Sequence, residues 1–144
     1  MRAALTTVCL VGLGACATTD AAEPAPVVAT DTVRTSDPRA LPPKTLAPGE
    51  CGLFGYSTDA PPRFVFFAVA DRALYHAGER GVLALSPQGA YPAETYGPVS
   101  LTLGPAEDLV EGRRYARSRL TEQLEDGYEW VRPLVVLETC GSTG

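Results

Sequence analysis

The sequence predicts one all-β domain, mainly antiparallel, folded as a small barrel or sandwich that ends in a C-terminal hairpin. Three observations predict this fold class. The six tyrosines, four phenylalanines and single tryptophan all lie between Phe54 and Trp130, which places the hydrophobic core in that part of the chain. Within it, short runs rich in aromatic and β-branched residues alternate with turn residues, as strands do. Near its end, Asp126-Gly127 separates two long β-capable runs and is a typical hairpin turn.

The 144-residue chain has room for one such domain, preceded by two segments of different composition. We assign residues 1–15 to a signal segment, residues 16–49 to a tether and residues 50–144 to the globular β domain. Six of the 13 prolines and no aromatic residue lie between residues 17 and 49. Neither a helix period nor a strand period survives there, so the tether is predicted to be a disordered, partly polyproline-like linker.

The first strands of the domain are predicted from short runs with turn signals between them. Asp59, Pro61 and Pro62 enforce a turn after the first run, and Asp71 marks a later one. The spacing favours an antiparallel sheet that folds on itself. The strands predicted in this part are residues 51–57, 63–70, 72–77 and 81–86.

A long loop follows these strands. Residues 86–98 contain three prolines and two glycines and show no apolar periodicity. The next residues form a short predicted strand with Val99, Leu101 and Leu103 on one face. Residues 104–112 are predicted as a turn with a helical fragment, so the fold class includes room for one short helix.

Residues 113–124 fit both a helix and a strand. A helix would place Ala116, Leu120 and Leu124 on one face, and a strand would place every second residue from Ala116 to Leu124 on one face. The Asp-Gly turn and the strand-like run after it favour the strand, and hence a long hairpin. Because Pro133 cannot donate to a strand ladder, the last strand is expected to lie at an edge there or to carry a bulge.

The sequence contains no catalytic or cofactor motif, and we expect that the protein is not an enzyme. No serine stands in a GxSxG setting, and no P-loop, dinucleotide fingerprint or zinc signature is present. The sole histidine, His76, is better explained as solvent-facing or hydrogen-bonded than as a general base. We therefore predict no catalytic residue, no cofactor and no metal site. The acidic clusters lie in turn-like sequence, where a charged surface is a simpler explanation than a glycosidase pair: Glu107, Asp108, Glu111, Glu122, Glu125 and Asp126.

The N-terminus predicts a secretory signal. Residues 3–13 form an uncharged stretch of small and aliphatic side chains, too short to span a bilayer but suited to the apolar region of a secretory signal. A short motif ends this stretch and resembles the lipobox of bacterial lipoproteins: Leu13-Gly14-Ala15-Cys16.

The resemblance implies that the chain is cleaved before Cys16 and that Cys16 carries a diacylglycerol thioether and an acylated amino group. Several acyl chains give stable attachment to a membrane. Lipoprotein sorting then implies a location in the cell envelope, because Ala17 rather than Asp follows the lipidated cysteine and favours the periplasmic face of the outer membrane.

The same resemblance leaves two cysteines for a disulfide bond. Cys9 would leave with the signal segment and Cys16 would carry lipid, so Cys51 and Cys140 remain. In an oxidising compartment two such thiols are expected to pair. The bond would tie the first strand to the last and make the domain a disulfide-closed barrel or sandwich. Metal binding is the alternative, but the two cysteines lack the close spacing of a zinc site.

Two groups of residues are candidate binding surfaces. Tyr91 and Tyr96, in the long loop, offer contact area with polar ends; alternatively, the loop folds back over a sheet edge. Arg113, Arg117 and Arg119 are expected to share one strand face that would meet anionic glycan or lipid head groups. The alternative for the arginines is a solvated hairpin face balanced by neighbouring glutamates.

Around GECGLF, RFVFF and DGYEW, the domain is similar to a group of small, uncharacterised envelope lipoproteins of GC-rich Gram-negative bacteria. The similarity covers residues 46–140 and implies no activity. We expect a lipid-anchored envelope protein whose non-enzymatic β domain binds or scaffolds an envelope protein or peptidoglycan. An inhibitor of a cell-wall hydrolase, like the lysozyme-inhibitor lipoproteins, is the alternative, since an acidic domain suits a basic lysozyme. A net charge of −5 provides no footprint for nucleic acid, which is not an expected partner.

Overall fold

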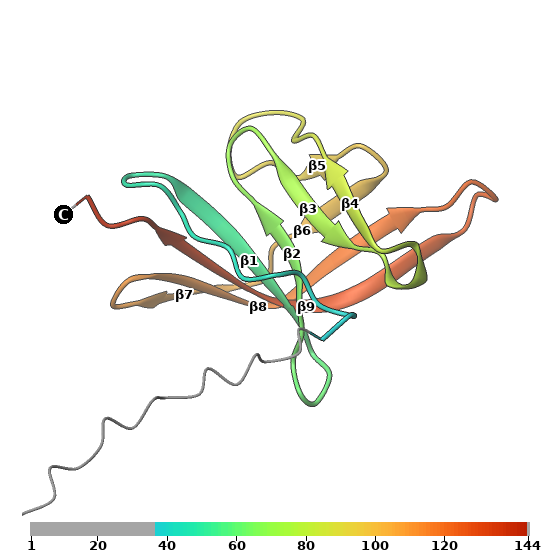
Figure 1. The fold of residues 1–144 in the computed structure, drawn as a ribbon, viewed down its shortest axis with the longest axis horizontal. Helices are drawn as coiled ribbons and strands as arrows, with labels where there is room; N and C mark the ends of the chain where they lie inside the picture. Colours follow the sequence, from blue (N-terminus) through green and yellow to red (C-terminus); the bar gives the residue numbers. More distant parts are fainter. Residues whose placement is uncertain (1–36, 144) are drawn as a thin grey trace, which may run out of the picture. The chain divides into compact units, whose positions relative to one another are not determined.

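A computed structural model describes residues 37–143, which form one antiparallel β-sheet (Figure 1). A short 3-10 helix, η1 (Gly78–Arg80), lies between the third and fourth strands, and no α-helix occurs among the described residues. The predicted all-β, mainly antiparallel class is confirmed. The strands are β1 (Cys51–Ser57), β2 (Phe64–Ala68), β3 (Ala73–His76), β4 (Val82–Leu85), β5 (Thr95–Tyr96), β6 (Val99–Thr102), β7 (Ala106–Leu109), β8 (Gly112–Gln123) and β9 (Glu129–Cys140).

The first strand of the sheet lies beside the last. The strand order is β4-β3-β2-β1-β9-β8-β6-β5, and β7 pairs with the start of β8. Cys51 stands opposite Cys140 in the β1–β9 register, and a disulfide bond joins them across a sequence separation of 89. The predicted pairing of these two cysteines is confirmed, and it ties the first strand to the last.

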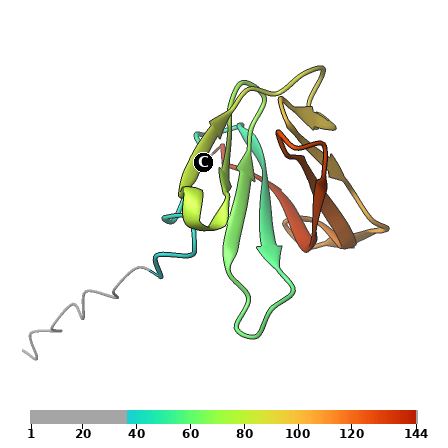
Figure 2. The same cartoon turned by 90° about the vertical axis from the view of Figure 1, so that its right-hand side faces the viewer.

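The sheet coils into a nearly closed barrel (Figures 1 and 2). An isolated bridge between Gln88 and Thr95 connects the chain just after β4 to β5, so the two ends of the sheet approach each other. Across the interior, the rings of Phe66 from β2 and Tyr96 from β5 meet edge to face at a centroid distance of 5.2 Å. The β2 and β5 arms of the sheet therefore face each other over one core.

The interior is apolar because alternate residues of each strand point into it. The predicted face of β6 is confirmed: Val99 and Leu101 are buried, and Leu103 packs against them in the core. Burial of such a side chain stabilises the fold by roughly 1.5 to 3 kcal/mol. The largest fully buried side chains of this core are Tyr75, Tyr96, Phe66, Leu53, Leu120 and Leu134.

A second apolar cluster lies outside the barrel, and it includes residues that precede the predicted start of the domain. Leu41, which precedes β1, is buried against Phe67, and Leu46 packs on the same cluster. The backbone N–H of Leu41 donates to the carbonyl oxygen of Phe64 at 2.7 Å. Residues 37–49 therefore pack on the sheet, and the globular domain begins before the predicted boundary at residue 50. The reason is that strand β2 is apolar on both faces and needs a cover on the outer one.

β8 is a strand along its full length, which excludes the helical alternative. Its register with β9 shifts between Tyr115 and Ser118, where two residues of β8 lie opposite one residue of β9. Arg117, within this bulge, has a φ of 56°. Because a bulge inserts one residue, the inward-facing positions change phase: Tyr115 is buried before it, and Ser118 and Leu120 are buried after it.

The helical fragment predicted for residues 104–112 is not formed. Strand β7 occupies this segment and pairs with β8 from Ala106 opposite Tyr115 to Leu109 opposite Gly112. β6 pairs with β8 only beyond the bulge, so the start of β8 offers an open edge to β7. Pairing with this edge makes residues 106–109 a strand, and the local sequence does not indicate that this pairing occurs.

The C-terminal hairpin is confirmed. Gly127 at its turn has a φ of 86°, which favours glycine, and the N–H of Leu124 donates to the carbonyl oxygen of Tyr128 at 2.9 Å. The prediction that Pro133 lies at an edge is also confirmed. β1 pairs with β9 only as far as Leu134, so Pro133 is paired on one side alone, with Arg119 of β8.

Several N-terminal predictions lie outside the described residues: the signal segment at 1–15, lipidation of Cys16, and the tether as far as residue 36. Between residues 37 and 143, no helix is long and apolar enough to cross a membrane.

Candidate functional site

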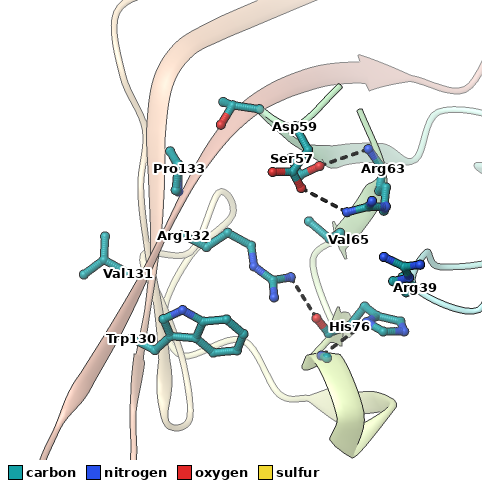
Figure 3. Close-up of a pocket in the computed structure, with 12 residues that line it drawn as sticks. Arg39, Ser57, Asp59, Arg63, Val65, His76, Trp130, Val131, Arg132 and Pro133 are labelled. Carbon is teal, nitrogen blue, oxygen red and sulfur yellow. Dashed lines mark hydrogen bonds and ion pairs between the residues drawn. The ribbon is translucent and has the colours of Figure 1, made fainter. Parts of the chain in front are cut away.

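The end of β1 opens a cleft in the wall of the barrel. β1 stops at Ser57, and residues 129–133 of β9 continue with β8 as their strand partner. A cleft of about 310 Å³ lies beside this part of β9, bounded by the ends of β1 and β2, by β3 with η1, and by Arg39 of the segment before β1 (Figure 3). We call it the arginine cleft and define it by Arg39, Arg63, Trp130 and Arg132.

Trp130 and Arg132 reach into the arginine cleft from β9 (Figure 3). The guanidinium carbon of Arg132 lies 4.7 Å from the ring centroid of Trp130 and 5.5 Å from that of Tyr75. Its Nη1 donates to the carbonyl oxygen of His76 at 3.0 Å. Arg132 is thus held between two aromatic rings by cation–π contacts and bridges β9 to β3. Trp130 nevertheless remains 42% exposed.

The opposite wall carries Arg63 and Arg39. Arg63 Nε donates to Asp37 Oδ2 at 3.2 Å, and its Nη1 donates to Asp59 Oδ2 at 3.1 Å. The backbone N–H of Arg39 donates to Asp37 Oδ1 at 2.9 Å, and this bond, with the charges of Arg63 and Arg39, lowers the pKa of Asp37. Within residues 37–143 the guanidinium of Arg39 forms no hydrogen bond or ion pair.

Ser57, Asp59 and His76 also line the arginine cleft, but they do not form a catalytic relay. His76 Nε2 lies 2.8 Å from the carbonyl oxygen of Pro38, and its Nδ1 accepts the N–H of Gly78 at 3.3 Å. Both ring nitrogens are thereby engaged by backbone groups. Ser57 Oγ accepts the backbone N–H of Arg63 at 3.0 Å. The interpretation of His76 as a hydrogen-bonded residue is confirmed.

Glu122 corrects the prediction that the acidic clusters are solvated. Its side chain is only 2% exposed and projects from the inner face of β8, and Oε1 accepts Arg80 Nη2 at 2.5 Å. Its Oε2 has no hydrogen-bond partner among the described residues. Plain strand alternation accounts for the difference, because Glu122 lies on the same face of β8 as Ser118 and Leu120, which point into the barrel.

The other acidic residues near β8 are exposed, as predicted. Glu107 pairs with Arg114 at 3.2 Å, and Asp108 pairs with Arg113 at 3.2 Å. These ion pairs are solvated and contribute little to stability. Residues 37–143 contain no group of three or more His, Cys, Asp or Glu side chains placed to hold a metal ion.

Tyr91 and Tyr96 do not form the exposed binding surface that was predicted. Tyr96 is fully buried, and the hydroxyl oxygens of Tyr91 and Tyr96 are both buried without a hydrogen-bond partner in the described structure. β5, which contains Tyr96, pairs with β6 and forms one end of the sheet. The alternative, that the loop folds back over a sheet edge, is the one that the structure supports.

Burial of Tyr96 predicts an alkaline loss of stability. Burial raises the pKa of Tyr96 from 10.0 to about 12. The folded protein keeps the phenol neutral while the unfolded chain ionises, so this contribution is complete below pH 10 and is lost between pH 10 and pH 12, by roughly 2 to 3 kcal/mol. Urea unfolding of the Tyr96→Phe variant should lack this part of the decline, and identical pH profiles would contradict the prediction.

The predicted arginine stripe is divided by the bulge. Arg113 precedes the bulge on the same face as Tyr115, Arg117 lies within the bulge, and Arg119 follows it on the outer face, opposite Pro133. The three side chains are exposed, but they do not share one strand face. The reason is that the inserted residue reverses the alternation of side chains.

The arginine cleft has the chemistry of an anion site. Three arginines line the cleft, Arg39, Arg63 and Arg132, and Arg63 pairs with the carboxylates of Asp37 and Asp59; the five charges together leave one positive charge in excess. Guanidinium groups bind carboxylates and phosphates through paired N–H donors. The arrangement can therefore bind an anion beside the exposed part of the Trp130 ring.

Sequence reasoning did not identify the arginine cleft. Its residues come from four separate segments, and the one available signal was Trp130, the sole tryptophan, with Arg132 two positions later on the same strand face. Comparison with known protein families, with curated proteins and with solved structures finds no match to this chain.

Proposed function

We propose that the protein is a lipid-anchored component of the cell envelope, attached through Cys16 to the outer membrane on its periplasmic side, and that its β domain binds another envelope component without chemical turnover. The binding part of this proposal rests on one observation: the arginine cleft is cationic and aromatic, whereas the chain as a whole is acidic. The partner would be peptidoglycan or an envelope protein that presents an anionic group.

The charge distribution supports this proposal. The chain carries a net charge of −5, whereas the arginine cleft carries an excess of positive charge. Of its three guanidinium groups, those of Arg39 and Arg132 form no ion pair with a carboxylate of the described residues. Arg132 is fixed between Trp130 and Tyr75, so little conformational entropy is lost when an anion binds it.

A non-enzymatic role is supported by how the polar groups of the arginine cleft are used. Acid–base or nucleophilic catalysis needs a nucleophile within hydrogen-bond reach of a base. The imidazole of His76 is bonded to backbone groups on both sides, and Ser57 Oγ accepts a backbone N–H. These contacts hold the walls of the cleft in place.

The binding proposal predicts that a single arginine of the cleft determines retention. Full-length protein in detergent would be passed over immobilised peptidoglycan and, separately, over immobilised envelope proteins. Arg39→Ala should weaken retention about tenfold, the effect of one charge-assisted hydrogen bond. Arg39 is exposed and forms no ion pair with residues 37–143, so this change should leave folding intact.

Arg113→Ala is the matched control, because it removes the same charge from an exposed strand position on β8, outside the cleft. Its retention should equal that of the wild type. Equal retention of the Arg39→Ala and Arg113→Ala variants, or no retention of the wild type on either support, would contradict the proposal.

The anchor is tested separately. Cys16→Ser removes the only thiol in the lipobox-like motif and should move the protein from the membrane fraction to the soluble periplasmic fraction, because the acyl chains supply the attachment. Fractionation followed by immunoblotting measures this change. Cys9→Ser is the control and should leave the protein in the membrane; membrane association of the Cys16→Ser variant would count against lipidation.

Inhibition of a cell-wall hydrolase is a second candidate, and a different surface favours it. A pocket of about 590 Å³ near the C-terminal hairpin turn is lined by Glu122, Glu125 and Asp126, together with Arg80. Its acidic rim would accept a lysine or arginine of a basic hydrolase. A fall in lysozyme activity on adding the full chain, restored by Glu125→Gln, would favour this function.

A further inference from the structure

We propose that the ligand of the arginine cleft is a carboxylated sugar, in which a pyranose ring packs on Trp130 and its carboxylate binds the guanidinium groups. This inference rests on the proposed function and narrows its ligand to one chemical class. Three features of the cleft carry it: an exposed aromatic ring, unused guanidinium donors and a small volume with polar walls.

Trp130 supplies the surface for a ring. Arg132 covers the indole at 4.7 Å, yet 42% of the residue remains exposed beside the cleft. An aromatic side chain that is both fixed and exposed offers a flat apolar platform at low entropic cost. The C–H faces of a pyranose pack on such a platform, whereas a bare inorganic anion would gain nothing from it.

The guanidinium groups supply the site for a carboxylate. Within residues 37–143 no guanidinium N–H of Arg39 donates a hydrogen bond, and Arg132 donates through Nη1 alone. Arg63 uses Nε and Nη1 for Asp37 and Asp59, which leaves Nη2. A carboxylate accepts two parallel N–H bonds from one guanidinium, so the donors that remain suffice to bind it.

The size and walls of the cleft favour one ring over a longer ligand. Its volume of about 310 Å³ is at the lower end of the range for ligand pockets, roughly 300 to 1,000 Å³. Asp59 lies across the cleft from Trp130 (Figure 3), Thr58 also lines the cleft, and both can exchange hydrogen bonds with ring hydroxyls. An extended peptide would need a longer groove than these residues enclose.

The sole tryptophan makes the test direct, because all the tryptophan fluorescence of the chain comes from the cleft. Full-length protein in detergent would be titrated with N-acetylmuramic acid, with N-acetylglucosamine, which lacks its lactyl carboxylate, and with lactate, which lacks the ring. N-acetylmuramic acid should change the Trp130 emission saturably, and the other two should bind about tenfold more weakly.

Variants locate the effect. Arg39→Gln should weaken binding of N-acetylmuramic acid about tenfold, and Arg113→Gln should leave it unchanged. If lactate binds as tightly as N-acetylmuramic acid, the site takes a bare anion and the sugar proposal is overturned, while anion binding by the cleft stands. If none of the three binds, the sugar proposal is overturned, and retention on envelope components decides the proposed function independently.

Discussion

Replacement of both Cys51 and Cys140 by alanine should lower the free energy of unfolding by about 4 to 5 kcal/mol, the largest stability change that we expect. The bond joins positions 89 residues apart, so its loss restores a large conformational entropy to the unfolded chain. A domain of this size has a total stability of roughly 5 to 15 kcal/mol. The loss therefore corresponds to between about a quarter and nearly all of the total stability.

Urea unfolding, followed by the fluorescence of Trp130, measures this loss. Cys51 and Cys140 are the only cysteines within residues 37–143, so a reductant should destabilise the wild type and leave the double-alanine variant unchanged. The β1–β9 pairing extends from Cys51 to Ser57 and would still hold the strands together in the native state. Equal midpoints for wild type and variant under oxidising conditions would refute the expectation.

Phe66→Ala should destabilise the protein by roughly 3 to 5 kcal/mol. Phe66 is fully buried at the centre of β2, and its ring meets the ring of Tyr96 across the barrel interior at 5.2 Å. Removal of this ring leaves a cavity between the β2 and β5 arms that the disulfide-tied sheet cannot close. The change in the urea midpoint at constant slope gives the loss.

Two variants serve as controls for this change. Phe66→Leu keeps most of the volume and should cost less than the alanine variant. Tyr128→Ala removes a ring of similar size that is 72% exposed and should alter stability by no more than about 0.5 kcal/mol. A Phe66→Ala variant as stable as Tyr128→Ala would show that the core does not depend on the cross-barrel contact.

Both stability predictions concern the frame that carries the arginine cleft. β1 holds β9 in place as far as Leu134, and the cleft begins where that pairing stops. Arg132 then crosses the opening to the backbone of His76 and to the ring of Tyr75. The proposed binding site thus lies where β1 no longer pairs with β9, and the side chain of Arg132 fills part of this opening.

Much of the fold was predictable because strands and turns carry local signals. The first strand, the hairpin turn at Asp126-Gly127 and the buried face of β6 all agree with the predictions. The edge position of Pro133 followed from its missing N–H alone. The disulfide bond followed from counting cysteines, once the lipobox-like motif had removed Cys16 from the count.

The errors share one physical origin, which is pairing between segments distant in sequence. The bulge at Arg117 inserts a residue into β8 and places Arg113 and Arg119 on different faces of the strand. The spacing of the arginines in the sequence indicates neither the positive φ of Arg117 nor the shift in strand register. Glu122 lies on the inward face of β8 with Leu120, and its ion-pair partner Arg80 comes from the distant helix η1. Leu41 belongs to the domain only because β2 has an apolar outer face to cover.

The sequence by itself determined the all-β class, the positions of most strands, the cysteine pair and the expectation of a lipid anchor, because each depends on residue types within a short stretch. Only the tertiary structure decided where the pairing of β1 with β9 ends. The position of that end determines where the residues of the cleft meet, namely Arg39, Arg63, Trp130 and Arg132. A binding cleft made by four segments is a product of strand register, and register is set by the packing of the whole barrel.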